Sequence, residues 1–239
     1  MLNRKDAIIL KNYDFGNSSK IIHILTQDSE RLSLIAKGAK RTKSQFAGNI
    51  EPLNLTQIVY YLKPGKDLGI LKEANIKESY ENLRKDLYSL NIAWGLIWIG
   101  RTIPSPMSGL FGLEKRALTF LNKGFKEEVI GYFLLSLFKL QGVSPQMDKC
   151  AKCGISEIEF FDIEEGKGVC KKCKKQSSIP FLHLKEKIQL LEKGRFKELQ
   201  EWKETNKKEL LKFLLKYGVY HLGEWLNRLS EILPFSITP

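Results

Sequence analysis

The chain has 239 residues, of which 43% are hydrophobic, so it can bury a sizeable core and is not globally disordered. Lysine and arginine outnumber aspartate and glutamate by 39 to 27, which gives a net charge of +12. This excess favours a polyanionic partner, with nucleic acid first and a membrane surface second. The longest apolar run, residues 92–99, is much shorter than the roughly 20 residues that a membrane-spanning helix needs.

Residues 1–78 are typical of β-structure. Alternating or short apolar runs predict five strands, at residues 7–10, 19–25, 32–36, 56–62 and 68–76. Turn residues separate the second strand from the third and the fourth from the fifth, and a short helix is expected near residues 44–49. Five strands with an insertion after the third favour a Greek-key barrel of the oligonucleotide-binding (OB) type, with an SH3-like barrel as the alternative.

From Tyr80 onward the apolar period becomes helical. It predicts helices at about residues 80–101, 114–122, 126–141, 184–192 and 206–229. In the first of these, Leu83, Leu87, Leu90 and Trp94 fall on one apolar face. The predicted fold class is therefore α+β. An OB-type barrel at residues 1–79 is followed by a helical domain at 80–239, which carries a four-cysteine zinc element at about residues 146–178.

The only four cysteines of the chain form two CxxC pairs, Cys150 with Cys153 and Cys170 with Cys173. This spacing is typical of a tetrahedral four-thiolate zinc site. Two disulfides and a redox pair are the alternatives. No secretory signal opens the chain, and a redox CxxC normally occurs once, so one structural zinc per chain is expected. Several lysines flank the pairs, and they can either offset the thiolate charge or touch phosphate.

The strongest basic cluster lies at residues 37–44, within a segment that has no acidic residue between Arg31 and Glu51. In an OB barrel this segment lies beside the oligonucleotide-binding face. The predicted DNA-binding residues are Lys37, Lys40, Arg41 and Lys43, together with Lys20 and Arg31. A solvated basic loop is the alternative.

Aromatic rings for base stacking are available at Tyr13, Phe15, Phe46, Tyr60 and Tyr61. The last two must point to opposite faces of their strand, so one is a core residue and the other is a candidate for stacking. We find no catalytic motif and no pattern of an open metal site, and we expect no enzyme activity.

Several blocks resemble the bacterial RecO family of recombination mediators over nearly the whole chain. They are residues 7–10, 13–19, 24–26 and above all 36–44, then residues 144–154 with Cys170 and Cys173, and more weakly 220–223 and 228–230. The chain departs from the family pattern at Asn17, where an acidic residue is usual, and after residue 228.

The resemblance implies a barrel and a helical domain with a zinc element. It also implies a cytoplasmic, nucleoid-associated protein that binds single- and double-stranded DNA and anneals complementary strands. The implied partners are RecR, single-strand DNA-binding protein and, indirectly, RecA. Two other classes stay open on the residues alone: an RNA-binding or ribosome-associated protein, and a nucleic-acid enzyme whose active site the sequence does not reveal.

Overall fold

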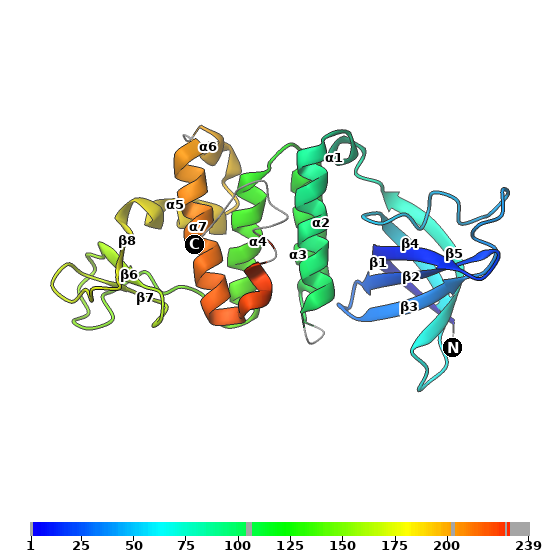
Figure 1. Cartoon of the computed structure of the whole chain (residues 1–239), viewed down its shortest axis with the longest axis horizontal. Coiled ribbons are helices and arrows are strands. Elements are labelled where there is room, and N and C mark those ends of the chain that lie inside the picture. The colour runs from blue at the N-terminus through cyan, green and yellow to red at the C-terminus, as the bar shows by residue number, and fades with distance from the viewer. Residues whose placement is uncertain (1, 104–106, 202–203, 228, 230–239) are drawn as a thin grey trace. The chain divides into compact units, whose positions relative to one another are not determined.

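The computed structural model describes residues 2–103, 107–201, 204–227 and 229 (Figure 1). The chain divides into two compact units, residues 1–124 and 125–239. The helices at residues 81–122 therefore group with the barrel, and a domain boundary after residue 79 remains a prediction. None of the helices in the described ranges is long and apolar enough to cross a membrane.

The first unit contains the predicted five-stranded closed barrel. Its strands are β1 (Leu2–Phe15), β2 (Ser19–Thr26), β3 (Arg31–Ala36), β4 (Leu55–Tyr61) and β5 (Leu68–Glu78), in the order β1-β2-β3-β5-β4. All neighbours pair antiparallel except β3 and β5, which are parallel. β1 is longer than the sequence predicts, because a bulge between Ile9 and Lys11 lets the strand continue along β2.

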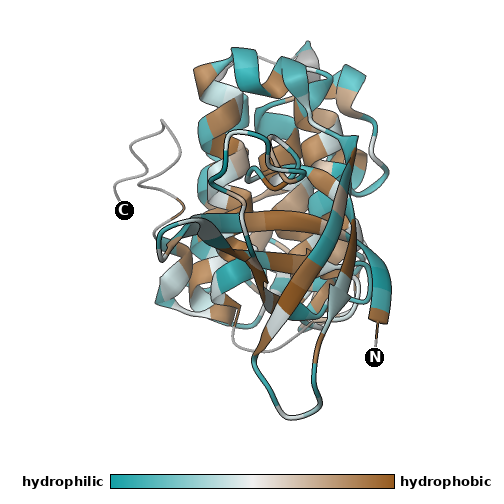
Figure 2. Ribbon diagram, turned by 90° about the vertical axis from the view of Figure 1, so that its right-hand side faces the viewer, coloured by the Kyte–Doolittle hydropathy of each residue, from teal (hydrophilic) through white to brown (hydrophobic). Residues whose placement is uncertain are grey.

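Alternate side chains fill the barrel. Ala7 and Ile9 from β1 are fully buried against Ile22 and Ile24 from β2. The residues between them point outward, so His23 lies on the outer surface between two interior isoleucines. Figure 2 shows the hydrophobic bands of the strands and the mainly hydrophilic loops at their ends.

The connection between β3 and β4 forms turns, so the prediction of a short helix at residues 44–49 is wrong. Its backbone bonds are isolated turn bonds, from Ala47 N–H to Ser44 O at 3.2 Å and from Asn49 N–H to Phe46 O at 3.0 Å. Gly48 has a φ of 74°, which ends any helical continuation. Phe46 reaches the barrel core and is 3% exposed, so the connection is anchored.

Three helices complete the first unit: α1 (Glu81–Lys85), α2 (Leu87–Thr102) and α3 (Leu110–Asn122). The single helix expected at residues 80–101 is interrupted at Asp86. Its side chain accepts hydrogen bonds from Ser89 N–H at 2.9 Å and from the Ser89 hydroxyl at 2.5 Å. Asp86 thereby caps a new helix, with an extended backbone that cannot continue α1.

The predicted apolar face of this region is also wrong. Leu87 is 73% exposed and Trp94 is 40% exposed, whereas Ile92, Leu96 and Ile99 are buried. α2 is hydrophobic on nearly all sides, so its sequence period does not identify the buried face.

The second unit is helical and carries the four-cysteine element. Its helices are α4 (Glu127–Leu140), α5 (Leu182–Glu192), α6 (Phe196–Gln200) and α7 (Glu204–Leu222), followed by the 3₁₀ turn η1 (Glu224–Leu226). α4 packs against α5 and α7. The expected helices at 126–141 and 184–192 are confirmed, α6 was not predicted, and α7 ends earlier than expected because Gly223 has a φ of 108°.

A small sheet lies between α4 and α5 in the sequence. Strands β6 (Phe160–Asp162), β7 (Lys167–Val169) and β8 (Ile179–Pro180) pair in the order β7-β6-β8. Phe161 is fully buried, and its ring contacts Phe181, Phe213 and Tyr217 at centroid distances of 4.8, 5.2 and 5.9 Å. These aromatic contacts fasten the sheet to α7.

Candidate nucleic-acid interface and metal centre

The basic loop, which we define as residues 37–44, has a fixed shape. It leaves β3 through Gly38, whose φ of 75° is favoured by glycine. Arg41 N–H donates to Gly38 O at 3.1 Å, and Ser44 N–H donates to Arg41 O at 3.0 Å. Lys40 N–H donates to Ser18 O at 2.9 Å, which ties the loop to the connection between β1 and β2.

The basic loop gathers four of the six predicted DNA-binding residues, and a fifth lies beside it. Lys37, Arg41 and Lys43 are exposed and form no ion pair with the described residues. Lys20 lies opposite Ala36 in the β2–β3 ladder, at the strand end where the loop begins, so the fold brings it to the loop. These side chains offer positive charge and hydrogen-bond donors to a phosphate backbone.

Two carboxylates partly neutralise this cluster, and the sequence analysis missed both. Lys40 Nζ lies 2.7 Å from Asp14 Oδ2, and Lys20 Nζ lies 3.8 Å from Glu51 Oε1. The hydrogen bond from Lys40 lowers the pKa of Asp14, so this carboxylate is ionised at neutral pH. Strand pairing could have indicated the position of Asp14. A hairpin at residues 16–18 places Asp14 opposite Lys20, at the strand end where the basic loop begins.

Arg31 lies at the opposite end of β3 from the basic loop, so the structure does not bring it into the cluster. Its two terminal nitrogens donate to the backbone carbonyls of Arg101 at 2.9 Å and Ile103 at 2.5 Å. These bonds join β3 to the end of α2. A DNA contact by Arg31 remains a prediction, separate from that of the loop.

The aromatic candidates divide by burial. Phe46 and Tyr60 are 3% exposed and belong to the barrel core. Tyr61 is half-buried, which confirms that the two neighbouring tyrosines point to opposite faces. Tyr13 and Phe15 are 41% and 47% exposed on β1, so they are available for stacking.

The four cysteines meet in one place, as the sequence predicts. Their four Sγ atoms lie within 4.8 Å of one another, and Cys153 Sγ is 3.7 Å from Cys170 Sγ. A tetrahedral zinc with Zn–S bonds of about 2.3 Å requires sulfur–sulfur distances of about 3.8 Å. The cluster therefore has the size and ligand set of a four-thiolate metal site.

Local backbone bonds build this geometry. Gly154 N–H donates to Cys150 O at 2.9 Å, and Cys173 N–H donates to Cys170 O at 3.1 Å, so each CxxC pair closes in a tight turn. Burial opposes ionisation of Cys150, but backbone N–H groups, led by that of Cys170, lower its pKa to about 6. Hydrogen bonds with Cys170 and Cys153 raise the pKa of Cys173 to about 12. Four adjacent thiolates need a cation, which a bound metal would supply.

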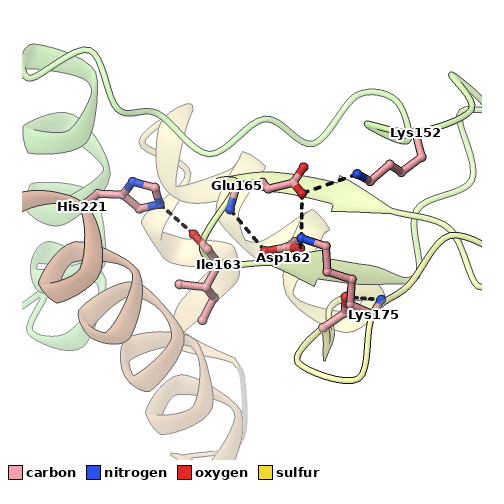
Figure 3. A network of polar contacts seen from close by, with 7 residues as sticks. Lys152, Asp162, Ile163, Glu165, Lys175 and His221 are labelled. Atoms are coloured by element: carbon pink, nitrogen blue, oxygen red, sulfur yellow. Dashed lines mark hydrogen bonds and ion pairs between the residues drawn. The ribbon is translucent and has the colours of Figure 1, made fainter.

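Ion pairs hold the four-cysteine element against its own sheet (Figure 3). Lys175 Nζ lies 2.8 Å from Asp162 Oδ2 and 2.7 Å from Glu165 Oε1, while Lys152 Nζ lies 3.6 Å from the same Glu165 oxygen. His221 Nε2 is 2.7 Å from Ile163 O and so connects the element to α7. Lys152 and Lys175 are therefore engaged within the element.

The net charge of the four-cysteine element favours a structural role over a contact with phosphate. Residues 146–178 contain seven lysines and six acidic residues. A zinc bound to four thiolates would add about two negative charges, so the element as a whole would not be basic. The strongly basic surface is instead the loop on the barrel.

A closed OB-type barrel with a basic loop, in a chain that also carries a four-cysteine element among helices, defines a class of nucleic-acid-associated proteins. The family model described as "Recombination protein O N terminal" matches residues 1–80, and the one described as "Recombination protein O C terminal" matches residues 104–230. The chain belongs to the RecO family of DNA repair proteins.

Curated relatives carry the same family name. A DNA repair protein RecO from Salinibacter ruber is 31% identical over 151 residues, which span 61% of this chain and 58% of that protein. The protein of that name from Bacillus pumilus is 27% identical over 72% of this chain and 69% of its own length. The one from Syntrophomonas wolfei is 27% identical over 90% of this chain and 89% of its own.

Proposed function

We propose that the chain is a non-enzymatic recombination mediator that binds single- and double-stranded DNA through the basic loop. The observation that carries the proposal is the fixed loop on an OB barrel, with Lys37, Arg41 and Lys43 exposed beside Lys40 and Lys20. Neutralising several phosphates gives an affinity that falls steeply with salt concentration. Annealing follows when two complementary strands are held with their charge repulsion reduced.

The test measures DNA binding of the double variant Lys40→Ala, Arg41→Ala against salt concentration. Arg41 forms no ion pair with the described residues, so its loss lowers the slope of log affinity against log salt by about 0.7 for single-stranded DNA. Lys40 is paired with Asp14 at 2.7 Å, so its loss lowers the slope by less than a further ~0.7. The weakening should be uniform across DNA sequences, because phosphate contacts carry no sequence information. The matched control, Lys115→Ala, Arg116→Ala, removes one exposed lysine and one exposed arginine from α3. An unchanged slope for the loop variant would refute this assignment.

We further propose that the metal is one structural zinc and that the protein acts in the cytoplasm at the nucleoid. The partners that the RecO family suggests are RecR, single-strand DNA-binding protein and RecA. Strand annealing on DNA coated with single-strand DNA-binding protein tests the mediator role, and a protein that binds bare DNA but anneals no coated strands contradicts it. Cleavage of DNA in magnesium would indicate an enzyme, and preference for a matched RNA over DNA would indicate an RNA-binding protein.

A further inference from the structure

A second basic feature of the barrel is a pocket of about 260 Å³ on its outer surface, where β1, β2 and β3 meet the end of α2. Its polar lining is formed by His23, Arg31, Ser33 and Arg101, and its remaining lining is aliphatic. All of these residues belong to the first compact unit. The volume is below the roughly 300–1,000 Å³ of pockets for drug-sized ligands, which suits a phosphodiester group with part of its sugar.

The arginines give the pocket a fixed positive charge. Two backbone carbonyls orient the guanidinium of Arg31, but they carry no formal charge and leave its charge in place. The buried carboxyl of Glu114 interacts with Arg31. Burial raises the pKa of Glu114 well above its usual range, against the effect of Arg31, which favours the neutral form of this carboxyl. Arg101 is exposed at the rim and can close on a bound anion.

His23 and Ser33 together can donate a hydrogen bond to a ligand, whether His23 is neutral or protonated. Ser33 Oγ lies 2.9 Å from His23 Nδ1. When the neutral ring accepts the hydroxyl proton, Nε2 carries the hydrogen and can donate to a ligand. When the ring is protonated, Nδ1 donates to Ser33 and the hydroxyl is free to donate. Burial lowers the pKa of His23, and the cations Arg101 and Lys11 lower it further.

An exposed aromatic ring adjoins the pocket. The Tyr13 ring stacks on the His23 ring with a centroid distance of 5.6 Å and an interplanar angle of 30°. Lys11 Nζ lies 5.8 Å from the Tyr13 centroid, close to the outer limit of about 6 Å for a cation–π contact. A base can displace this long, exposed side chain and stack on the tyrosine.

We propose that this pocket holds a backbone phosphate of single-stranded nucleic acid, and that Tyr13 stacks with a base beside that phosphate. The proposal rests on the proposed function and adds a second contact point on the same barrel. His23 is three residues from Lys20 along β2, or about 10 Å at the usual rise of a strand. This odd spacing directs the two side chains to opposite faces of β2, so a nucleic-acid strand that reaches both the pocket and the basic loop must pass around the end of β2.

The experiment measures binding of a fluorescent oligo-dT to the full chain by anisotropy, across salt concentrations. Arg101→Gln should reduce the salt slope by about 0.7, as expected for one lost phosphate contact on a single strand. Tyr13→Leu should weaken binding about 5-fold to 160-fold, the usual range for one base–aromatic stack, with the slope unchanged. Arg116→Gln on α3 is the matched control and should match the wild type. Arg31 is bonded to the backbone of Arg101 and not to its side chain, so Arg101→Gln keeps that contact.

The pH dependence supplies a second readout. The charged groups around His23 are Lys11 on β1, Arg31 on β3 and Arg101 on α2. Protonation of His23 adds a cation to the pocket. Burial and the neighbouring cations hold the pKa of His23 below 6.5, so wild-type affinity should increase as the pH falls from 6.5 to 5. His23→Gln, which retains a polar partner for Ser33, should lose this increase.

The two proposals fail in different ways. If the wild type does not bind oligo-dT at low salt, the proposed function itself fails. If the wild type binds and the loop variant is weakened, but Arg101→Gln and Tyr13→Leu bind like the wild type, only the pocket proposal is overturned. Equal slopes for Arg101→Gln and Arg116→Gln would likewise reject the phosphate contact. Thermal unfolding of each variant shows whether it is folded.

Discussion

Replacing Asp14 with asparagine should strengthen DNA binding. Asp14 Oδ2 lies 2.7 Å from Lys40 Nζ, so this carboxylate competes with phosphate for one cation of the basic loop. The lysine depresses the pKa of Asp14, so the carboxylate is ionised under all ordinary assay conditions. The asparagine side chain has nearly the same shape as aspartate and carries no negative charge.

The size of the effect follows from the number of contacts. When the Asp14 carboxylate is removed, Lys40 becomes available for one phosphate contact. Each phosphate contact to a single strand adds about 0.7 to the salt slope. The Asp14→Asn variant should therefore bind DNA more tightly than the wild type at low salt. Between 50 and 200 mM salt, its affinity should fall about 2.6-fold more than that of the wild type.

Fluorescence anisotropy with a labelled oligonucleotide at several salt concentrations measures both quantities. Glu81→Gln on α1 is the matched control, because it removes an exposed negative charge from the same compact unit. The steeper slope should disappear when Asp14→Asn is combined with Lys40→Ala, since the released cation is then missing. An equal gain from Glu81→Gln, or an undiminished gain without Lys40, would show that only net charge matters and would refute the reasoning.

Three further predictions concern the second unit. Metal analysis should find about one zinc per chain, released by a mercurial thiol reagent and lost in Cys153→Ser, whereas a folded, metal-free chain with intact thiols would contradict the site. Lys207→Met should reduce the free energy of unfolding in urea by about 3–5 kcal/mol, because buried Glu128 loses its cation at 2.8 Å and keeps the Lys126 N–H at 3.1 Å. The exposed control Lys216→Met should change the free energy of unfolding by less than about 0.5 kcal/mol. Burial raises the pKa of Tyr217 to about 12, whereas a tyrosine in the unfolded chain has a pKa near 10. The protonated Tyr217 hydroxyl therefore contributes its full stability below pH 10, and this stability is lost as the pH rises toward 12. The stability difference between wild type and Tyr217→Phe should therefore narrow between pH 9 and pH 12, and a constant difference in urea unfolding would contradict this.

The barrel was predictable because its strands follow the local rule that alternate side chains face alternate sides. Ile22 and Ile24 enter the interior while His23 remains outside, as the two-residue period requires. The 3.6-residue hydrophobic period of helices failed to predict the buried face of α2. α2 is apolar on several faces, so the period could not show that Leu87 would be exposed and Ile92 buried.

The metal site shows the same contrast. The two CxxC pairs indicated a four-thiolate cluster because each pair is a local turn that aims two sulfur atoms at one point. The ion pairs of Lys175 with Asp162 and Glu165 were not predictable, since solvated and bonded lysines look alike in a sequence. Asp162 ends β6, where a carboxylate is usually solvated, but here only 3% of its side chain is exposed.

By itself, the sequence determined the five barrel strands, the helical character of the chain after them, the cysteine cluster and the basic loop, because these depend on side-chain period, spacing and charge along a short stretch of chain. Only the tertiary structure decided which charges remain available to a ligand. It paired Lys40 with Asp14 and oriented Arg31 through two carbonyls of the α2 end. It also placed His23, Ser33 and Arg101 around one pocket. Those relations join residues far apart in the chain, and they arise when the barrel closes and α2 packs against it.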